Sequence, residues 1–410
     1  MMAESLEDKT SREFLYIANQ QEGPFDEVQR VIMAYEQRKP ILMGGDPGSG
    51  KTQLAKFLSR ILGKPIHRIV CEPEKEVADL LGHETLIAVG EEGQQKATAT
   101  GFKKGEMVPA MERGEIAYLD EFNKLRHGVQ KGLNSILEDT STYRIDGKEQ
   151  RAHDETCYIM AYNPGTGTDL EDIEPAVFDR CEYIRFEDQP KDFQIRVAMV
   201  KAGLLTTDEI VDEDMEERAI EVIDEGGKKR FRFLVKGNDG YWYKYGKAER
   251  VEPQGKLHTY FFYKGSGDQK LTTDNERANR YYQVISNLAE FIHDVKEVIR
   301  KGSNALPDDF REALGISRFN KLEGHMPSFR LVISNVRKYI SYTEQHDVEP
   351  ELVMEQIAYD VINTVCAKIP SDQKVGKNIT AKEMLRYIAM ARGLLRREGY
   401  PDIPDLPSHY

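Results

Sequence analysis

The clearest chemical motif in the sequence is a glycine-rich segment at residues 45–52. It reads Gly-Asp-Pro-Gly-Ser-Gly-Lys-Thr and fits the pattern GxxxxGK[ST] at every fixed position. Its glycines allow backbone N–H groups to point at phosphate oxygens, and a following helix N-terminus adds partial positive charge. Lys51 would reach the β- and γ-phosphates, and the Thr52 hydroxyl would ligate Mg²⁺. The segment predicts a nucleotide-binding loop made of Gly45, Asp46, Pro47, Gly48, Ser49, Gly50, Lys51 and Thr52.

The residues on either side predict the two elements that such a loop needs. Pro40–Met43 is a short apolar run suited to a strand buried on both faces. After the loop, residues 51–62 place their apolar side chains on one helical face, and Gly63 suits the helix end. The alternative is a chance glycine-rich turn, which the flanking strand and helix disfavour.

Hydrolysis of a bound nucleotide also needs a metal-binding carboxylate and a group that polarises water. Residues 114–124, GEIAYLDEFNK, supply a second apolar strand that ends in Asp120 and Glu121. We expect Asp120 to hold the Mg²⁺ shell and Glu121 to polarise the attacking water. Acidic pairs after apolar runs are common, so this prediction depends on the pair following the glycine-rich loop.

A third apolar run, residues 156–162, ends at Asn163. The carboxyl ends of parallel strands meet at one sheet edge, so Asn163 could hold the attacking water or sense the γ-phosphate. The alternative for this residue is an ordinary Asn-Pro turn that ends a strand.

Arg180 directly precedes a fourth strand candidate, Cys181–Phe186, where core packing explains an arginine poorly. It could enter the nucleotide site of a neighbouring subunit, where its charge would stabilise the phosphoryl transition state. A surface ion pair with Asp179 or Glu182 is the alternative.

The composition limits the classes of protein to which the chain can belong. Its 410 residues suggest two or three domains, and 40% hydrophobic content is enough for sizeable cores. The net charge of -13 argues against a generic nucleic-acid binder. The 4 cysteines lack metal-ligand spacing, no apolar run is long enough to span a bilayer, and the polar N-terminus lacks a signal-peptide core. We therefore expect a cytoplasmic protein without membrane insertion.

These motifs in this order resemble the AAA+ ATPases, specifically the MoxR branch and its CbbQ/NorQ members. The resemblance extends from about residue 20 to residue 342 and is interrupted by one insertion. Residues 77–82 match the branch's Asp-Leu-hydrophobic-Gly element, and 84–100 resemble its helix-2 insert, a hairpin raised toward a ring pore. Residues 101–111 resemble the segment that leads to the acidic strand, and 133–147, with a turn at Asp146-Gly147, resemble its helix and pre-sensor hairpin.

Two further elements of the resemblance carry arginines. Residues 174–180 resemble the element that bears the arginine finger, which assigns that role to Arg180. Glu174-Pro175 reverses the Pro-Glu order of the family, and Cys181 occupies the position where the family has Phe. Neither change removes a catalytic group. Residues 327–330, PSFR, resemble the sensor-2 motif, in which Arg330 would touch the γ-phosphate.

The resemblance implies an α/β fold: a P-loop AAA+ parallel sheet flanked by helices, then an α-helical lid interrupted by a small β-rich insertion. It also implies a homo-hexameric ring that hydrolyses ATP with Mg²⁺ between subunits and remodels or activates a protein client as a chaperone. Family members typically work with a von Willebrand factor A-domain partner. Three alternatives stay open: a nucleic-acid-directed motor, a nucleotide-stabilised scaffold with negligible turnover, and a GTP-specific motor.

The domain boundaries that we expect are 1–189 for the nucleotide-binding domain, 190–225 and 273–345 for the lid, 226–272 for the insertion and 346–410 for C-terminal helices and a tail.

Residues 208–225 carry 10 acidic residues against one basic residue and predict a helix with a solvated acidic face. Residues 226–272 have a net charge of +7 and contain 10 of the chain's 37 aromatic residues. They predict an antiparallel β-module, serving either as a structural or protein-docking unit or as the only segment that could bind nucleic acid.

Overall fold

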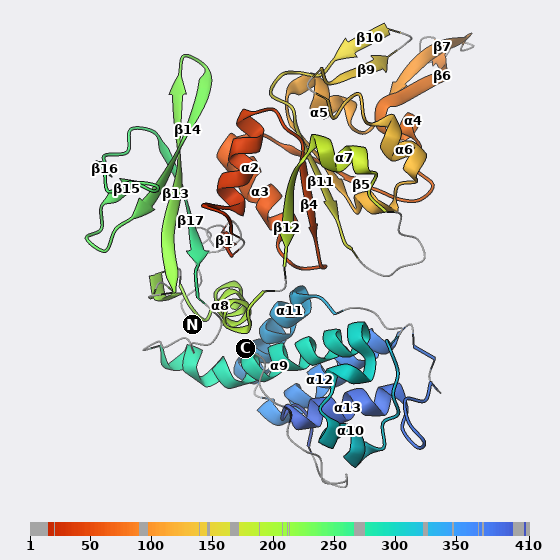
Figure 1. The fold of residues 1–410 in the computed structure, drawn as a ribbon, viewed down its shortest axis with the longest axis vertical. Helices are drawn as coiled ribbons and strands as arrows, with labels where there is room; N and C mark the ends of the chain where they lie inside the picture. Colours follow the sequence, from red (N-terminus) through yellow and green to blue (C-terminus); the bar gives the residue numbers. More distant parts are fainter. Residues whose placement is uncertain are drawn as a thin grey trace.

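The structure, a computed structural model, describes residues 15–406 except 20, 90–96, 139, 146–147, 165–171, 188, 207, 211, 213, 266–274, 323–326, 347, 368, 371–372 and 397–405. Figure 1 shows a central sheet with helices on both faces, a second sheet beside it and a helical region at the opposite end of the molecule.

The central sheet has five parallel strands in the order β12-β4-β11-β8-β5. Their bounds are β4 Ile41–Gly45, β5 Ile66–Val70, β8 Ile116–Asp120, β11 Cys157–Tyr162 and β12 Glu182–Phe186. The strands predicted at the loop, at the acidic pair, before Asn163 and after Arg180 are confirmed. Because all five strands are parallel, their carboxyl ends lie along one edge.

Alternating strand residues send their side chains to two separate cores, one on each face of this sheet. On β4, Ile41 and Met43 join the core under α2 and α3, whereas Leu42 joins the core on the opposite face. The first pair of helices spans α2 Glu27–Glu36 and α3 Lys51–Leu62, and the other face is covered by α4 Val77–Leu81, α5 Val108–Arg113, α6 His127–Gly132 and α7 Pro175–Arg180. The expected helix-flanked parallel sheet is therefore confirmed.

Two hairpins extend from this domain at one end of the molecule (Figure 1). The first joins β6 Gly82–Val89 to β7 Ala97–Lys104, and the second joins β9 Thr142–Ile145 to β10 Lys148–Arg151. Both predicted hairpins are confirmed. The turn at Asp146-Gly147 and the tip of the first hairpin lie outside the described residues.

The helical region follows β12 and resumes after the second sheet. It consists of α8 Lys191–Ala202, α9 Glu276–Lys301, α10 Asp308–Leu314, α11 Phe329–Ile340, α12 Pro350–Cys366 and α13 Ala381–Ala391. One hydrophobic core unites these helices. A capping box formed by Thr380 and Glu383 begins α13. In the part of the chain that the structure covers, no helix combines the length and the apolar character needed to cross a bilayer.

The second sheet shows that the predicted helix over residues 208–225 is wrong. Residues Met215–Glu225 form strand β13, preceded by a short 3-10 turn at Asp208–Ile210. β13 lies between two antiparallel neighbours in a six-stranded sheet with the order β1-β17-β13-β14-β15-β16. The other strands of this sheet are β1 Ile17–Ala18, β14 Lys228–Lys236, β15 Trp242–Lys244, β16 Arg250–Val251 and β17 Lys256–Tyr263. Cross-strand pairing on both edges outweighs the helical spacing of its apolar residues.

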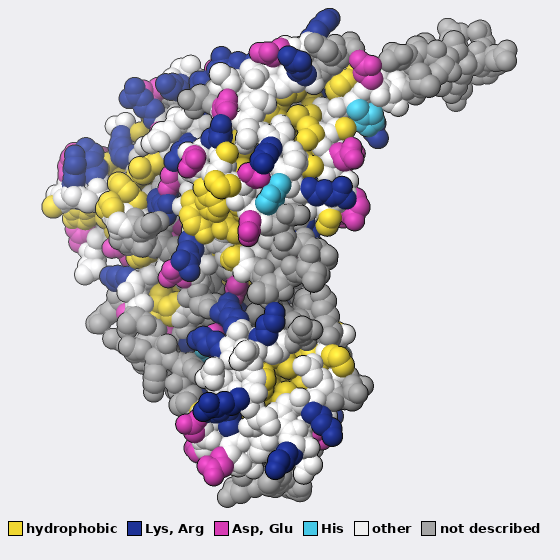
Figure 2. Space-filling view, turned by 45° about the vertical axis from the view of Figure 1, so that its right-hand side comes forward, with side chains coloured by type: hydrophobic (Ala, Val, Ile, Leu, Met, Phe, Trp, Pro, Cys, Tyr) yellow, Lys and Arg dark blue, Asp and Glu magenta, His cyan; other side chains and the backbone are white. Residues whose placement is uncertain are grey.

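The acidic strand neutralises much of the basic one. Ion pairs between β14 and β13 join Arg230 to Glu225, Arg232 to Glu221 and Lys236 to Glu217. In Figure 2, cationic and anionic side chains are interspersed over the face in view and form no continuous basic surface. Three of the basic side chains of the insertion are therefore balanced by the acidic strand that precedes it.

The second sheet packs on the outer side of α2 and α3 and shares their core. Ile220 of β13 and Tyr260 and Phe262 of β17 lie in the same buried cluster as Val28 of α2 and Phe57 of α3. Arg218 of β13 forms a buried ion pair with Asp26, the residue that caps α2. The insertion is therefore an integral part of the domain that contains the central sheet.

Candidate nucleotide-binding site

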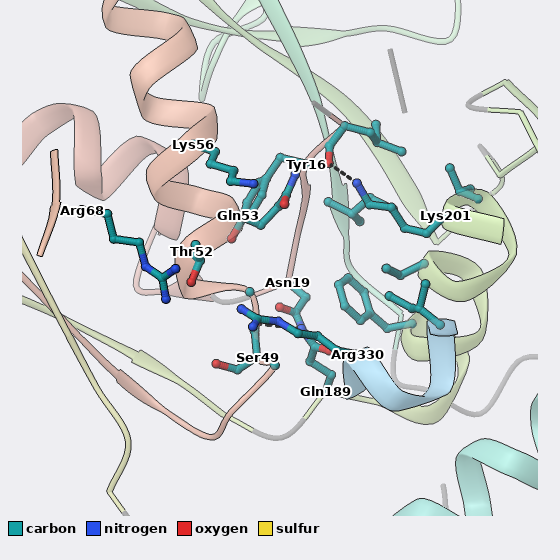
Figure 3. Close-up of a pocket in the computed structure, with 18 residues that line it drawn as sticks. Tyr16, Asn19, Ser49, Thr52, Gln53, Lys56, Arg68, Gln189, Lys201 and Arg330 are labelled. Carbon is teal, nitrogen blue, oxygen red and sulfur yellow. Dashed lines mark hydrogen bonds between the residues drawn. The ribbon is translucent and has the colours of Figure 1, made fainter. Parts of the chain in front are cut away.

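A cavity of about 400 Å³ lies where the glycine-rich loop, the N-terminal segment and the helical region meet. Figure 3 shows side chains from α3, β5, β1 and the lid helices α8 and α11 turned toward it. The loop contributes Gly48, Ser49, Gly50 and Thr52 to its lining. The predicted loop therefore borders a cavity that the helical region and the N-terminal segment also line.

The backbone of the glycine-rich loop requires glycine at two of its positions. Gly50 has φ 111, a left-handed conformation that favours glycine, and it directly precedes the first residue of α3. A Cβ on Gly45 would lie 2.5 Å from the carbonyl oxygen of Phe186, so the strand end tolerates no side chain there. The loop is thus set by close packing against β12 as well as by its own turn.

Lys51 is buried at the start of α3 and has folded back onto the loop. Its Nζ donates to the carbonyl oxygens of Gly45 at 2.5 Å and Asp46 at 2.8 Å. Burial lowers the pKa of Lys51 to about 8, an effect that Asp120 opposes and Arg330 reinforces. A phosphate in the cavity would offer this ammonium a stronger partner than the two carbonyls.

The two predicted metal ligands, Thr52 and Asp120, are linked through a residue that we did not predict. The hydroxyl of Tyr118 lies 3.1 Å from Thr52 Oγ1 and donates to Asp120 Oδ1 at 3.5 Å. The other oxygen of Asp120 accepts from the Arg68 guanidinium of β5 at 2.6 Å. An alcohol and a carboxylate are hard oxygen donors, which fit Mg²⁺ completed by water and phosphate oxygens. The described residues contain no group of three or more His, Cys, Asp or Glu side chains set to hold a metal.

Glu121 stands at the turn that follows β8, and its backbone is strained. Its φ of 59 is rare outside glycine and turns the carboxylate away from the line of the strand. Lys124 donates to Glu121 Oε2 at 2.7 Å, and about a third of the side chain is exposed, 37%. This carboxylate can therefore reach a water molecule at the sheet edge.

Asn163 follows β11, the strand that separates the loop strand β4 from the acidic strand β8. The Asn123 side chain donates to its carbonyl oxygen at 2.9 Å and fixes the backbone. Its side-chain oxygen is buried without a hydrogen-bond partner among the described residues. A buried amide oxygen without a partner is costly, which favours a role toward a ligand or water over that of a simple turn.

The side of the cavity away from the phosphate loop is apolar, and the sequence did not reveal it. Tyr16 and Ile17 of the N-terminal segment face Phe193 and Val197 of α8 and Ile333 of α11 across it. The N-terminal segment is held by the second sheet, because Ile17 pairs with Phe261 and the Phe261 N–H donates to Tyr16 O at 3.2 Å. Such a slot suits a flat aromatic base.

Arg330, the residue expected from the sensor-2 resemblance, is the second residue of α11. It lines the same cavity as Ser49 and Thr52, and Figure 3 shows its side chain beside Ser49 and Gln189. A second lid contact, which we did not predict, joins Arg300 of α9 to the carboxylate of Asp46. Arg300 of the helical region therefore contacts the loop, and Arg330 lines the cavity beside it.

Arg180 does not line this cavity among the described residues. Its guanidinium donates to Glu138 at 2.8 Å and to the carbonyl oxygen of Ala176 at 2.8 Å. It instead borders a separate open hollow of about 570 Å³ together with Lys39, Glu138 and Asp179. The anticipated surface ion pair exists, but with Glu138 in place of Asp179 or Glu182.

Comparisons with known proteins agree with this geometry. Residues 40–181 match the model of an AAA domain of the dynein-related subfamily. Protein CbbQ of Hydrogenophilus thermoluteolus is 25% identical over 181 residues, which are 44% of this chain and 64% of CbbQ. The denitrification regulatory protein NirQ of Pseudomonas aeruginosa is 25% identical over 44% of this chain and 67% of its own length. Protein NorQ of Paracoccus denitrificans is 27% identical over 44% and 64%.

The matched segment spans about two thirds of each of these relatives. It contains the glycine-rich loop, the acidic pair and Asn163, the residues that the parallel sheet brings to one edge. The domain match and the strand order show that the chain contains an AAA ATPase domain, and over this domain the chain is similar to the MoxR-type proteins CbbQ, NirQ and NorQ.

Proposed function

We propose that this chain hydrolyses ATP with Mg²⁺ and uses the energy to remodel or activate a protein client. One observation carries the proposal: Lys51 and Thr52 of α3, Asp120 of β8 and Asn163 after β11 come from three separate segments and lie at one sheet edge. The cavity at this edge joins that polar end to an apolar slot that suits a base. Core stability alone requires neither the buried Lys51 nor the strained Glu121.

Each residue then has a defined task. Loop N–H groups and Lys51 bind the phosphates, and Thr52 and Asp120 hold Mg²⁺, which would neutralise phosphate charge. Glu121 takes a proton from the attacking water, and Asn163 orients that water. Arg330 contacts the γ-phosphate from the lid, so loss of that phosphate loosens the lid from the loop.

We further propose that the active form is a homo-hexameric ring. Arg180 supports this idea because it lies outside its own nucleotide cavity, beside an open hollow that a neighbour could fill. The two hairpins at one end of the domain would then contact the client, and a von Willebrand factor A-domain protein would deliver it. The regulatory name of NirQ supports an activating role on another protein.

The test compares the wild-type protein with Glu121→Gln and with Arg180→Ala. Glu121→Gln should bind ATP as the wild type does and lose turnover by about 100-fold or more, because general-base catalysis contributes that much. Arg180→Ala should also lose turnover, and mixing it with Glu121→Gln subunits should restore part of it. Full turnover in Glu121→Gln would contradict the catalytic assignment, and full turnover in Arg180→Ala would contradict the ring.

A further inference from the structure

Tyr118 carries a hydroxyl group that the core does not need. It lies on β8 two residues before Asp120, so both side chains project from the same side of the strand. The ring is 1% exposed and packs in the cluster formed by α2, α3 and the sheet. Phenylalanine would fill the same volume without bringing a polar atom that must find a hydrogen-bond partner.

The partners of this hydroxyl are the two predicted metal ligands. Thr52 begins α3 and Asp120 ends β8, and the phenol oxygen lies between them, 3.1 Å from one and 3.5 Å from the other. Each hydroxyl has one proton to give. A chain in which Thr52 donates to Tyr118 and Tyr118 donates to Asp120 satisfies both, and it leaves the Thr52 lone pairs free to bind a cation.

We propose that Tyr118 is a positioning residue that presents Thr52 and Asp120 to the magnesium ion of the nucleotide. The inference rests on the proposed function and adds a residue that sets the affinity for the metal. Tyr118 acts through its hydroxyl alone, because the ring is needed for packing in any case. Arg68 holds the other Asp120 oxygen, so the carboxylate is fixed on both sides.

The experiment uses Tyr118→Phe with Tyr158→Phe as its matched control. Tyr158 is a buried tyrosine on β11 whose hydroxyl bonds to Ser141 at 2.8 Å on the other face of the sheet. Binding of a fluorescent ATP analogue is titrated in EDTA and over a range of Mg²⁺ concentrations. Tyr118→Phe should leave the affinity in EDTA within about twofold and raise the half-saturating Mg²⁺ concentration about 3- to 10-fold, since one hydrogen bond is lost. Tyr158→Phe should change neither.

Three outcomes would overturn the assignment. The first is wild-type Mg²⁺ dependence in Tyr118→Phe, and the second is an equal shift in Tyr158→Phe. The third is an affinity that falls in EDTA as much as in Mg²⁺, which would mean that Tyr118 only supports the fold. A thermal melt of each variant shows that it is folded before titration. If the wild type binds no nucleotide, the proposed function itself fails, and that result is distinct from the other three.

Discussion

The two sheets of this molecule use similar numbers of strands for different purposes. In the parallel sheet, polar residues gather where the strands end, and the interiors of the three central strands β4, β11 and β8 are mainly apolar. In the second sheet, charged residues lie along the strands and are balanced within the sheet, as Lys236 and Glu217 are. The residues proposed for catalysis therefore lie at the edge of the first sheet, whereas the second sheet has a structural role beside the site.

The second sheet reaches the nucleotide cavity at its N-terminal edge strand β1. Ile17 and Ala18 pair with β17 of the second sheet, while Tyr16 and Ile17 line the nucleotide cavity. Tyr16 also stacks on Phe57 of α3, the helix that begins with Lys51. The second sheet therefore shapes the base side of the site without contributing a catalytic group.

We expect the largest effect from removal of residues 226–272, which tests whether the two sheets depend on each other for folding. We expect the deletion to abolish folding of the nucleotide-binding domain, because β17 contributes Tyr260 and Phe262 to its core and is the partner of β1. Circular dichroism and limited proteolysis would measure this. A folded, ATP-hydrolysing deletion variant would show that the insertion is a separable module.

A single substitution should produce a smaller version of the same effect. Arg218→Ala leaves the fully buried Asp26 without its cation at 2.6 Å, which should cost about 3–5 kcal/mol of unfolding free energy. The matched control is Lys236→Ala on the same sheet, where the partly exposed pair with Glu217 contributes about 1 kcal/mol or less. Urea denaturation of both variants measures the difference. Equal costs would mean that the sheet is not anchored through α2.

A third prediction concerns the catalytic sheet and pH. In the free protein burial brings the pKa of Lys51 to about 8, whereas the charged form binds phosphate. Above that pH the site must take up a proton to bind, so ATP affinity should fall by up to about tenfold per pH unit. Titration of a fluorescent nucleotide between pH 7 and pH 9.5 would show this fall. Lys51→Arg stays charged over this range and should flatten the profile; the same slope in that variant would assign the effect to another group.

The sequence predicted the catalytic sheet well because its signals are local. The loop, the strand ending at Asp120 and the strand ending at Asn163 each combine an apolar run with a polar end, and the structure brings them together. The nucleic-acid alternative depended on the net charge and the aromatic residues of segment 226–272, considered without the rest of the chain. Pairing with the acidic strand β13 weakens it, because the charges that looked unbalanced in sequence are neighbours in space.

The second sheet and the other residues of the site could not be predicted from local motifs. The apolar spacing of residues 215–223 suits a helix or a strand, and pairing with β14 and β17 decides between them. The two-residue turn Gly226-Gly227, with φ 66 and 87, was the available signal for a hairpin that starts before residue 226. Tyr16 and Arg68 reach the cavity, and Tyr118 reaches Thr52, only through strand register and long-range packing, so no local motif marks them.

Hydrogen exchange tests most directly the central claim that both sheets build one nucleotide pocket. Glu121→Gln is compared free and saturated with ATP and Mg²⁺, so that turnover does not blur the bound state. We predict slower exchange at residues 45–52 and also at β1 and β17, including the Phe261 N–H that bonds to Tyr16. Slower exchange confined to the loop and α3, with β1 and β17 unchanged, would contradict the claim.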